Sequence, residues 1–204
     1  ICVLTYNNYH DTAECLESLL KLRDDFHTTL LIDNGSTDNS LIKIHKRFPN
    51  IEILELKKNI GVPAGFNQGI QIALNKGFEY IFILNNDTVV NPEILPHLLE
   101  VAEDDQDCAL VMPQIRYYPP NNHDDSRKNI WSDGGYYRKF PPGIVHKDRR
   151  RNIIFSESRK VEYVPTCGLL IHRRAFEKVG LFDPGYFFFF EDWDFSKRVR
   201  EAGL

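Results

Sequence analysis

The sequence contains no apolar run long enough to cross a lipid bilayer. A membrane-spanning helix needs about 20 consecutive apolar residues, and the aromatic run Phe187–Phe190 has only four. Positive charge is not in excess either, since 25 Lys and Arg oppose 29 Asp and Glu. Proteins that bind nucleic acid usually carry a strongly basic surface. We therefore expect no membrane-spanning segment and no nucleic-acid partner.

Cysteine is scarce and widely spaced. No Cys-X-X-Cys pair is present, and no spacing of Cys and His is typical of structural zinc. Reduced thiols and a cytoplasmic location are therefore expected. The chain begins at Ile1 inside an apolar run, without Met or a signal peptide, and it stops just after Gly203. This pattern predicts a fragment of a longer protein.

The first half alternates short apolar runs with amphipathic segments, as expected for a parallel sheet built from βαβ units. The predicted strands are Ile1–Thr5, Thr28–Ile32, Ile51–Leu56, Tyr80–Leu84 and Ala109–Met112. The predicted helices are Asp11–Leu22, Leu41–Phe48, Ala64–Lys76 and Pro92–Ala102. Asp11 with Glu14 is typical of a capping pair, and Asn91 is typical of a cap before Pro92.

Residues 114–160 break this pattern with Pro-Pro, Asn-Asn and Gly-Gly pairs, which indicate turns and irregular loops. After this insertion we expect strands at Val161–Pro165 and Leu169–His172, and helices at Arg174–Val179 and Asp192–Ala202. A chain of 204 residues with this pattern suits one domain with an elaborated second half.

Polar residues follow the first two predicted strands, where ligands of open α/β sheets bind. Thr5 and Asn7 follow the first strand, and Asp33 begins the sequence Asp-Asn-Gly-Ser-Thr-Asp after the second. The carboxylate of Asp33 is suited to accept hydrogen bonds from a nucleobase, while loop amides and hydroxyls suit ribose and phosphate oxygens. One interpretation is a nucleoside pocket, and the alternative is a helix-capping turn.

Two further loops follow predicted strands. The segment Lys57–Asn67 contains glycines that permit close approach to a ligand. It has no Gly-Lys-Ser/Thr or Gly-X-Gly-X-X-Gly pattern, which disfavours an ATPase or a dinucleotide dehydrogenase. The fourth strand ends in Asn85-Asn86-Asp87. Asp87 offers a hard oxygen ligand to a divalent cation bound to diphosphate, although such a tripeptide also forms ordinary turns.

Three carboxylates, Glu191, Asp192 and Asp194, begin the last predicted helix. The positive end of a helix favours anions, so we expect a carboxylate here to keep a low pKa and to serve as a general base toward a sugar hydroxyl. Phe187–Phe190 and Trp193 offer stacking faces for sugar rings, but we expect most of them to pack in the core.

A basic segment lies in the insertion, at residues 147–151, and Arg159 and Lys160 follow it. Such a cluster suits contact with diphosphate or with anionic lipid. The alternative is a solvated loop without a ligand.

Together these segments resemble the family 2 inverting glycosyltransferases of the GT-A fold, particularly their rhamnosyltransferase-like branch. The resemblance covers nearly the whole chain and rests on the order and spacing of the segments. They are Thr5-Tyr6-Asn7, Asp33–Asp38, Asn59-Ile60-Gly61, Ala64–Asn67, Asn85–Thr88, Gly168–Ile171, Arg173-Arg174, Phe182-Asp183 and Glu191-Asp192.

The resemblance implies an α/β fold of the GT-A type, with a Rossmann-like, mostly parallel sheet flanked by helices. It implies one catalytic domain over residues 1–204, in which 1–113 bind the nucleotide sugar and 114–204, including loop 114–160, bind the acceptor. The chain would be an inverting hexosyltransferase or rhamnosyltransferase of bacterial surface polysaccharide synthesis. Its acceptor would be a saccharide or a lipid-linked saccharide at the inner face of the membrane, with which the chain would associate peripherally.

The resemblance also assigns roles to residues. Asp192 would be the general base, Glu191 would orient the base or the acceptor, and Asp87 would hold a divalent cation, Mg or Mn. Asn85 stands where the commoner Asp-X-Asp motif has its first Asp, which leaves one negative charge fewer for the cation. The residues expected to bind the nucleotide are Thr5, Asn7, Asp33, Asn59, Gly61, Asn67, Asn85 and Asn86.

Two rival functions remain open. A sugar-1-phosphate nucleotidyltransferase would share the sheet, but it resembles a different pattern, with a glycine-rich, arginine-containing loop after the first strand. Tyr6–His10 contains neither residue. A non-catalytic nucleotide-sugar-binding module would keep the fold without the chemistry, and the presence of Asp87 and Asp192 counts against it.

Overall fold

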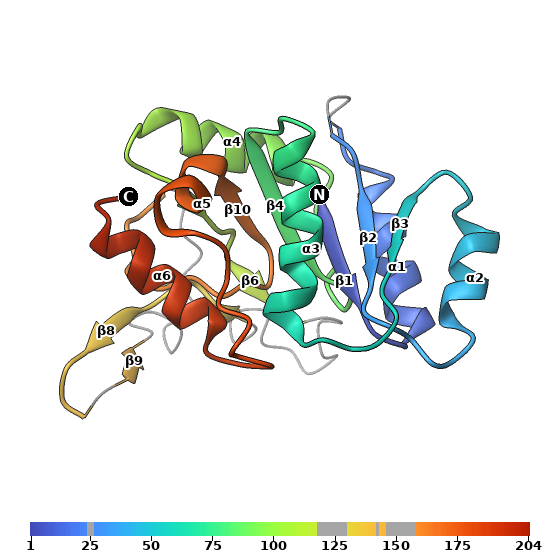
Figure 1. The fold of residues 1–204 in the computed structure, drawn as a ribbon. Helices are drawn as coiled ribbons and strands as arrows, with labels where there is room; N and C mark the ends of the chain where they lie inside the picture. Colours follow the sequence, from blue (N-terminus) through green and yellow to red (C-terminus); the bar gives the residue numbers. More distant parts are fainter. Residues whose placement is uncertain (24–26, 118–129, 142, 146–157) are drawn as a thin grey trace, which may run out of the picture.

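The chain forms a central sheet of six strands in the computed structural model, which describes residues 1–23, 27–117, 130–141, 143–145 and 158–204. The strands are β1 Cys2–Thr5, β2 Leu30–Asp33, β3 Glu52–Glu55, β4 Tyr80–Asn85, β5 Leu110–Val111 and β10 Leu169–His172. Their order is β3-β2-β1-β4-β10-β5 (Figure 1). β1 to β4 are parallel, and β10 is antiparallel to β4 and β5. This confirms an α/β fold with a mostly parallel sheet.

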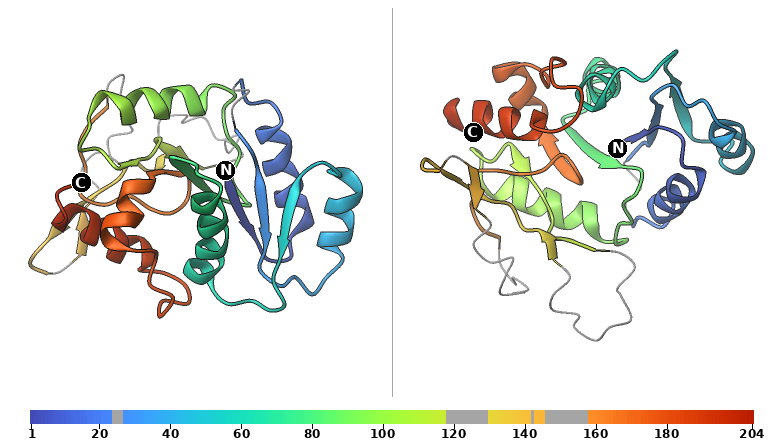
Figure 2. Two further views of the ribbon diagram at one scale, coloured as in Figure 1. Left: turned by 45° about the horizontal axis from the view of Figure 1, so that its top comes forward. Right: turned by 90° about the horizontal axis from the view of Figure 1, so that it is seen from below.

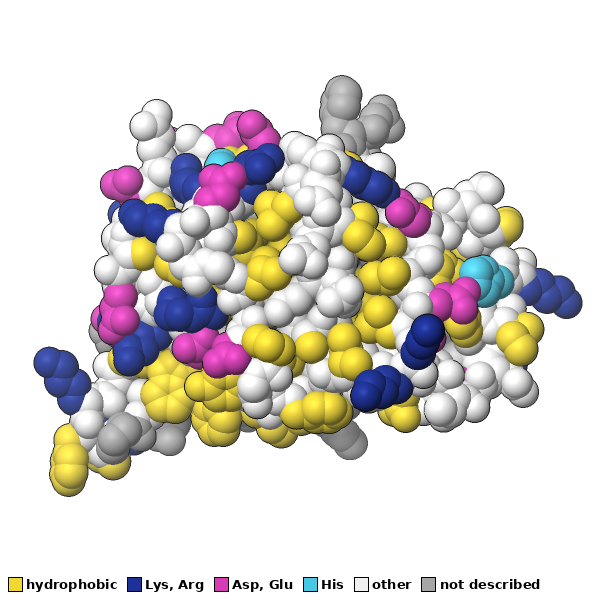
Figure 3. All heavy atoms as spheres, in the orientation of Figure 1, with side chains coloured by type: hydrophobic (Ala, Val, Ile, Leu, Met, Phe, Trp, Pro, Cys, Tyr) yellow, Lys and Arg dark blue, Asp and Glu magenta, His cyan; other side chains and the backbone are white. Residues whose placement is uncertain are grey.

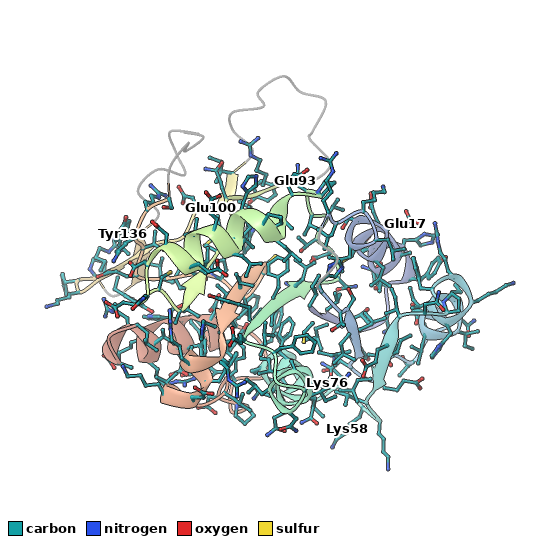
Figure 4. All side chains as sticks on the ribbon, turned by 90° about the horizontal axis from the view of Figure 1, so that it is seen from above. Glu17, Lys58, Lys76, Glu93, Glu100 and Tyr136 are labelled. Atoms are coloured by element: carbon teal, nitrogen blue, oxygen red, sulfur yellow. The ribbon has the colours of Figure 1, made fainter. Side chains whose placement is uncertain are left out.

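Helices cover both faces of the sheet (Figure 2). They are α1 Tyr9–Leu19, α2 Ser40–Arg47, α3 Val62–Asn75, α4 Ile94–Asp104, α5 Arg173–Val179 and α6 Glu191–Glu201. In Figure 4, α4 with Glu100 and α1 with Glu17 lie on one side of the sheet, and α3 with Lys76 at its end lies on the other. None of the described helices combines the length and apolarity needed to span a membrane.

The core lies in two layers, one on each side of the sheet. Alternate residues of a strand point to opposite faces. Ile81 and Ile83 of β4 therefore pack in one cluster with α3, α5 and α6, while Phe82 and Leu84 pack in the other with α1, α2 and α4. Because β4 is buried on both faces, its sequence is a continuous apolar run.

Two glycines let α3 lie close to the sheet. A Cβ at Gly65 would lie 2.7 Å from Leu4 Cδ1, and one at Gly69 would lie 2.4 Å from Ile32 Cδ1. Any larger residue at these positions would push α3 away from β1 and β2. The close contact holds the first residue of α3, Val62, near the carboxyl ends of these strands.

The insertion predicted over 114–160 forms two small antiparallel sheets in its described part. β6 pairs with β7, and β8 pairs with β9. The bounds are β6 Ile115–Arg116, β7 Ile130–Ser132, β8 Tyr136–Arg138 and β9 Gly143–Val145. The basic segment 147–151 lies outside the described residues.

The strand predicted at Val161–Pro165 is wrong. In this described stretch only Tyr163 pairs, through an isolated bridge with Gly135. The apolar alternation reflects burial against α6. The Val164 backbone N–H donates to the Ser196 hydroxyl, and that hydroxyl donates to the Val164 carbonyl, both at 3.2 Å. Burial produced the strand-like pattern without placing the segment in a sheet.

Both predicted helix starts that relied on caps are also displaced. α1 begins at Tyr9, two residues before Asp11, which instead accepts a hydrogen bond from the Asn8 side chain within the first turn. α4 begins at Ile94, after a turn in which the Asn91 side chain accepts from the Glu93 backbone N–H at 2.9 Å. Asp11 and Asn91 thus form hydrogen bonds close to the helix starts, but neither is the residue before the first helical residue. The capping pattern therefore located each helix start only to within two or three residues.

Candidate active site

The polar residues predicted to form the site gather at the carboxyl edge of the sheet, the lower edge in Figure 1. Thr5 at the end of β1 pairs in register with Asp33 at the end of β2. The loop before α3 reaches the segment before α6, because the Val62 backbone N–H donates to the Phe187 carbonyl at 2.9 Å. One edge therefore carries both the loops after β1 to β3 and the acidic start of α6.

Asn7 and Asp33 are joined through Ser36. The buried carboxylate of Asp33 accepts hydrogen bonds from the Ser36 backbone N–H at 3.1 Å and from the Ser36 hydroxyl. The Ser36 hydroxyl oxygen accepts from the Asn7 backbone N–H at 2.7 Å, and Asn7 Oδ1 accepts from the Thr37 N–H at 2.9 Å. The two loops thus form one bonded unit, and Asp33 Oδ2 keeps a lone pair for a ligand.

Asn34, which the sequence motif contains but which we did not single out, links this unit to the loop before α3. Its buried amide nitrogen donates to Asn59 Oδ1 and to the Gly61 carbonyl, both at 3.1 Å. Its oxygen accepts from the Ile60 backbone N–H at 3.1 Å. Gly61 has a φ of +90°, and a Cβ there would lie 2.6 Å from the Phe187 carbonyl oxygen, so this position needs glycine.

Thr5 and Asn86 meet at Thr12 of α1. The hydroxyls of Thr5 and Thr12 share a hydrogen bond of 2.8 Å, and the Asn86 amide donates to the Thr12 hydroxyl at 2.9 Å. These bonds tie the end of β4 to the end of β1. Thr12 lies inside a helix, where no local pattern identifies it as part of a site.

The structure corrects the placement of Asn67. Its side chain is buried in α3, and its amide donates to the Phe182 carbonyl at 2.8 Å and accepts from the Phe182 N–H at 3.1 Å. Asn67 therefore fastens α3 to the segment that leads into α6. These two hydrogen bonds account for an asparagine on an otherwise apolar face of the helix. They use both the oxygen and the nitrogen of the side-chain amide, so no bond to a nucleotide is needed to explain this residue.

Asp87 lies exposed at the end of β4, beside the half-buried Asn85. Among the described residues no group of three or more His, Cys, Asp and Glu side chains is arranged to hold a metal ion. Burial raises the pKa of the neighbouring Cys15 thiol to about 12, and it also raises the pKa of Cys167. Both stay protonated thiols, which are poor ligands for a hard cation. The residues present fit a cation that takes most of its ligands from a diphosphate.

The three carboxylates of α6 have different surroundings. The half-buried Asp192 accepts from the Tyr163 hydroxyl at 2.6 Å and from the Trp193 backbone N–H at 2.7 Å. Asp194 accepts from Arg198 Nε at 2.7 Å and forms an ion pair with it. Glu191 is buried, with Oε1 accepting from the Thr166 hydroxyl at 3.2 Å. Its Oε2 has no hydrogen-bond partner among the described residues.

The low pKa predicted for a carboxylate at the start of α6 is wrong for Glu191 and Asp192. Burial raises the pKa of Glu191, and the nearby charge of Asp192 adds to the rise. Burial also raises the pKa of Asp192, although the Tyr163 hydroxyl and the Trp193 N–H act in the opposite direction. The removal of water around the start of α6 therefore outweighs the attraction of the helix end for anions.

The burial expected for the aromatic run is also wrong. Phe187, Phe188, Phe189 and Phe190 are 58 to 64 % exposed, and Phe189 and Phe190 have a φ of +69°. Figure 3 shows apolar side chains gathered along this lower edge of the molecule. All four side chains therefore form an exposed aromatic segment directly before Glu191 and Asp192.

Comparison with known proteins supplies a family for this architecture. The family model described as "Glycosyl transferase family 2" matches residues 1–180. The chain is 26% identical over 219 residues to an N-acetylglucosaminyl-diphospho-decaprenol L-rhamnosyltransferase of Mycobacterium tuberculosis, covering 100% of this chain and 70% of the relative. It is 28% identical over 115 residues to a poly-beta-1,6-N-acetyl-D-glucosamine synthase of Staphylococcus aureus, covering 54% of this chain and 27% of that protein.

Solved structures share the fold. A mannosyltransferase, PcManGT, from Pyrobaculum calidifontis in complex with GDP-Man and Mn2+ aligns with a TM-score of 0.64 at 15% identity, over 100% of this chain and 52% of that one. GalNAc-T7 with UDP, GalNAc and Mn2+ aligns with a TM-score of 0.72 at 16% identity, over 97% of this chain and 39% of that one. This chain thus spans about half or less of those structures.

Proposed function

This chain belongs to glycosyl transferase family 2, and we propose that it transfers a sugar from a nucleotide diphosphate sugar to an acceptor hydroxyl with inversion. The observation that carries the proposal is the bond between the Val62 N–H and the Phe187 carbonyl. It sets the loops that suit a nucleotide against the segment that leads into Asp192. The loops that we assign to the donor and the carboxylate that we assign as the base therefore share one edge of the sheet.

The nucleotide of the donor would lie over the ends of β1, β2 and β4. The residues that we assign to it are Thr5, Asn7, Asp33, Asn59, Gly61, Asn85 and Asn86. Asp33 would accept hydrogen bonds from the base, since its Oδ2 retains a lone pair beside the Ser36 turn. The GDP-Man and UDP named for the solved neighbours support a nucleoside diphosphate as the ligand class.

A divalent cation, Mg or Mn, would be held by Asp87 with Asn85 nearby, and it would neutralise charge on the departing diphosphate. The exposure of Asp87 at the end of β4 supports this assignment, since the carboxylate is open to a ligand shared with the substrate. The Mn2+ named for both solved neighbours supports the same class of cation.

Asp192 would remove the proton from the acceptor hydroxyl as that oxygen attacks the anomeric carbon. The bond from this carbon to the diphosphate oxygen breaks, and its electron pair leaves with the nucleotide. Attack from the face opposite the leaving group inverts the anomeric centre in one displacement. A raised pKa supports Asp192 as the base, because a stronger base gains more from the proton transfer. Glu191 would orient the acceptor or the base through Oε2, which has no hydrogen-bond partner in the described part of the chain.

The acceptor would bind beside the exposed aromatic segment Phe187–Phe190, which we assign to a saccharide or a lipid-linked saccharide. Aromatic faces stack on sugar rings and also suit apolar chains. The name of the mycobacterial relative specifies a polyprenol-linked acceptor, which supports the second class. We therefore place the chain in cell-surface polysaccharide synthesis at the cytoplasmic face of a membrane, with peripheral association, 1–113 serving the donor and 114–204 the acceptor in one domain.

A donor screen tests this function. The full-length protein is incubated with radiolabelled uridine, thymidine and guanosine diphosphate sugars, together with free and polyprenol-linked saccharides. We expect one donor to give a labelled product whose anomeric configuration, read by NMR, is opposite to that of the donor. Exchange of labelled pyrophosphate into the nucleotide sugar would identify a nucleotidyltransferase instead. Saturable donor binding without any transfer would identify a binding module.

A further inference from the structure

The carboxylate of Asp192 is held on both of its oxygens. The Tyr163 hydroxyl donates to Oδ2 at 2.6 Å, and the Trp193 backbone N–H donates to Oδ1 at 2.7 Å. A carboxylate oxygen has two lone pairs, so each oxygen can still accept one further proton donor. The two bonds restrict rotation of the side chain while they leave room for a substrate hydroxyl.

Tyr163 is fastened to α6 on both sides. The residue before it, Glu162, accepts from Arg200 at 2.8 Å. The residue after it, Val164, bonds through its backbone to Ser196 at 3.2 Å. Because Arg200, Ser196 and Asp192 all belong to α6, the phenol and the carboxylate that it contacts are held in one rigid unit.

The insertion supports the same tyrosine from the other side. The backbones of Tyr163 and Gly135 exchange two hydrogen bonds, at 3.0 and 3.1 Å. A Cβ at Gly135 would lie 2.4 Å from Ile144 Cγ2 of β9, so the insertion packs tightly on this bridge. The backbone of Tyr163 is therefore held by both α6 and the insertion.

Tyr163 remains a hydrogen-bond donor over the physiological pH range. Burial raises the pKa of its phenol well above the usual value, and the charge of Asp192 adds to the rise. Among the described residues, the other titratable groups that interact with Asp192 are Glu191 on its own helix and Tyr137 from β8. Tyr137 does not serve Asp192 as a donor, because its hydroxyl donates to the Trp193 carbonyl at 2.9 Å.

We propose that Tyr163 is a positioning residue for the general base, whose hydroxyl fixes the Asp192 carboxylate in the orientation that receives the acceptor proton. This proposal rests on the proposed role of Asp192. The bond stabilises the ionised carboxylate, so it also lowers the pKa of Asp192. The base form is then present at a lower pH. Tyr163 acts through Asp192 and needs no contact with the substrate.

The test compares Tyr163→Phe with Tyr137→Phe in the full-length protein. Each variant loses one half-buried phenol hydroxyl that bonds to the first turn of α6, but only Tyr163→Phe loses a bond to the Asp192 side chain. In Tyr163→Phe we expect kcat to fall about 10-fold with an unchanged donor KM. The acidic limb of its kcat/KM profile should move up by about one pH unit, the shift that corresponds to loss of a hydrogen bond to a charged group. Tyr137→Phe should leave that limb in place.

A second measurement separates this proposal from the proposed function. Carbon-13 NMR of aspartate-labelled protein follows the titration of the Asp192 carboxyl, which is assigned by its loss in Asp192→Asn. A higher Asp192 pKa in Tyr163→Phe alone supports the proposal, and equal values in wild type and Tyr163→Phe overturn it. If the wild type transferred no sugar, the function would fail, while the titration would still show whether Tyr163 controls Asp192.

Discussion

The loops after β1 to β3 and the acidic start of α6 are stabilised in different ways. The loops bond to one another across neighbouring strands, as Asn7 does with Ser36 and Asn34 does with Asn59. Asp192 is held by Tyr163, which lies in a segment without regular secondary structure. A site at the ends of adjacent parallel strands follows from the strand pattern itself, whereas a site at the start of α6 depends on contacts with an irregular segment that is distant in the sequence.

The largest effect expected from a single substitution is on the α6 side. Asp192→Asn keeps the size and polarity of the side chain but removes its basicity, so kcat should fall by about 10²–10⁴. The nucleotide Kd, measured by calorimetry, should not change, because the loops after β1 to β3 are untouched.

The matched control is Asp194→Asn, two residues further along the same helix. Asp194 already pairs with Arg198, which also donates to the carbonyls of Val179 and Leu181. We expect this variant to melt earlier and to keep near-normal turnover. Near-normal turnover in Asp192→Asn as well would show that the base is another group. The start of α6 would then have no catalytic role to set against the loops after β1 to β3.

The next largest effect is expected at the loops after β1 to β3, to which we assign the nucleotide. Asp33→Ala should weaken nucleotide binding by about 1.5–3 kcal/mol, the range for a hydrogen bond that involves a charged partner, which is roughly 10- to 150-fold in Kd. Ser36→Ala is the control, because it breaks the hydroxyl bond to Asp33 while it keeps the carboxylate. Equal losses in both variants, measured by calorimetry, would mean that Asp33 serves only to hold the turn.

The same contrast explains which features were predictable from the sequence. β10 agrees with its predicted bounds, Leu169–His172, and β4 extends one residue beyond its own, to Asn85. Buried strands leave apolar runs, and the polar residues that follow them mark the carboxyl edge of the sheet. The approach of Asp33 to Asn7 could therefore be anticipated without any knowledge of the side-chain bonds.

Other features depend on distant contacts that leave no local pattern. Tyr163 meets Asp192 from 29 positions away, and Asn67 meets Phe182 across 115. The raised pKa of Asp192 needs the buried surroundings that these contacts create. The exposure of Phe187–Phe190 was missed for the same reason, because an aromatic run has the same composition in a core and on a surface.

A smaller effect is expected on stability, and it tests whether Glu191 is buried at the start of α6. Burial raises the pKa of Glu191 in the folded chain, so the proton that it binds contributes stability below the unfolded pKa, and this contribution is lost as pH rises through the folded value. Glu191→Gln cannot ionise. Its melting temperature at pH 8 should exceed that of the wild type by roughly 2–4 °C, which corresponds to about 1 kcal/mol for a chain of this size.

The control for Glu191→Gln is Glu201→Gln, at the exposed end of the same helix. The stabilisation in Glu191→Gln should vanish toward pH 4, where the carboxyl is protonated in both states, and Glu201→Gln should show no such trend. Parallel melting curves of wild type and Glu191→Gln from pH 4 to 8 would show that the unpartnered Oε2 is solvated in the folded protein.

The smallest effect is expected from metal alone. It tests whether the protein supplies enough ligands to bind the cation before the nucleotide is bound. Asp87 is exposed, Asn85 is neutral, and no cluster of three ligating side chains lies among the described residues. A cation would therefore depend on the diphosphate for most of its coordination. Stabilisation follows ligand concentration relative to Kd, so manganese or magnesium alone should shift the melting temperature by less than about 1 °C, and only metal with nucleotide should exceed nucleotide alone. Asp87→Asn should abolish that excess and keep the nucleotide shift. A full shift with metal alone would require protein ligands outside this edge of the sheet, and the assignment to Asp87 would be wrong.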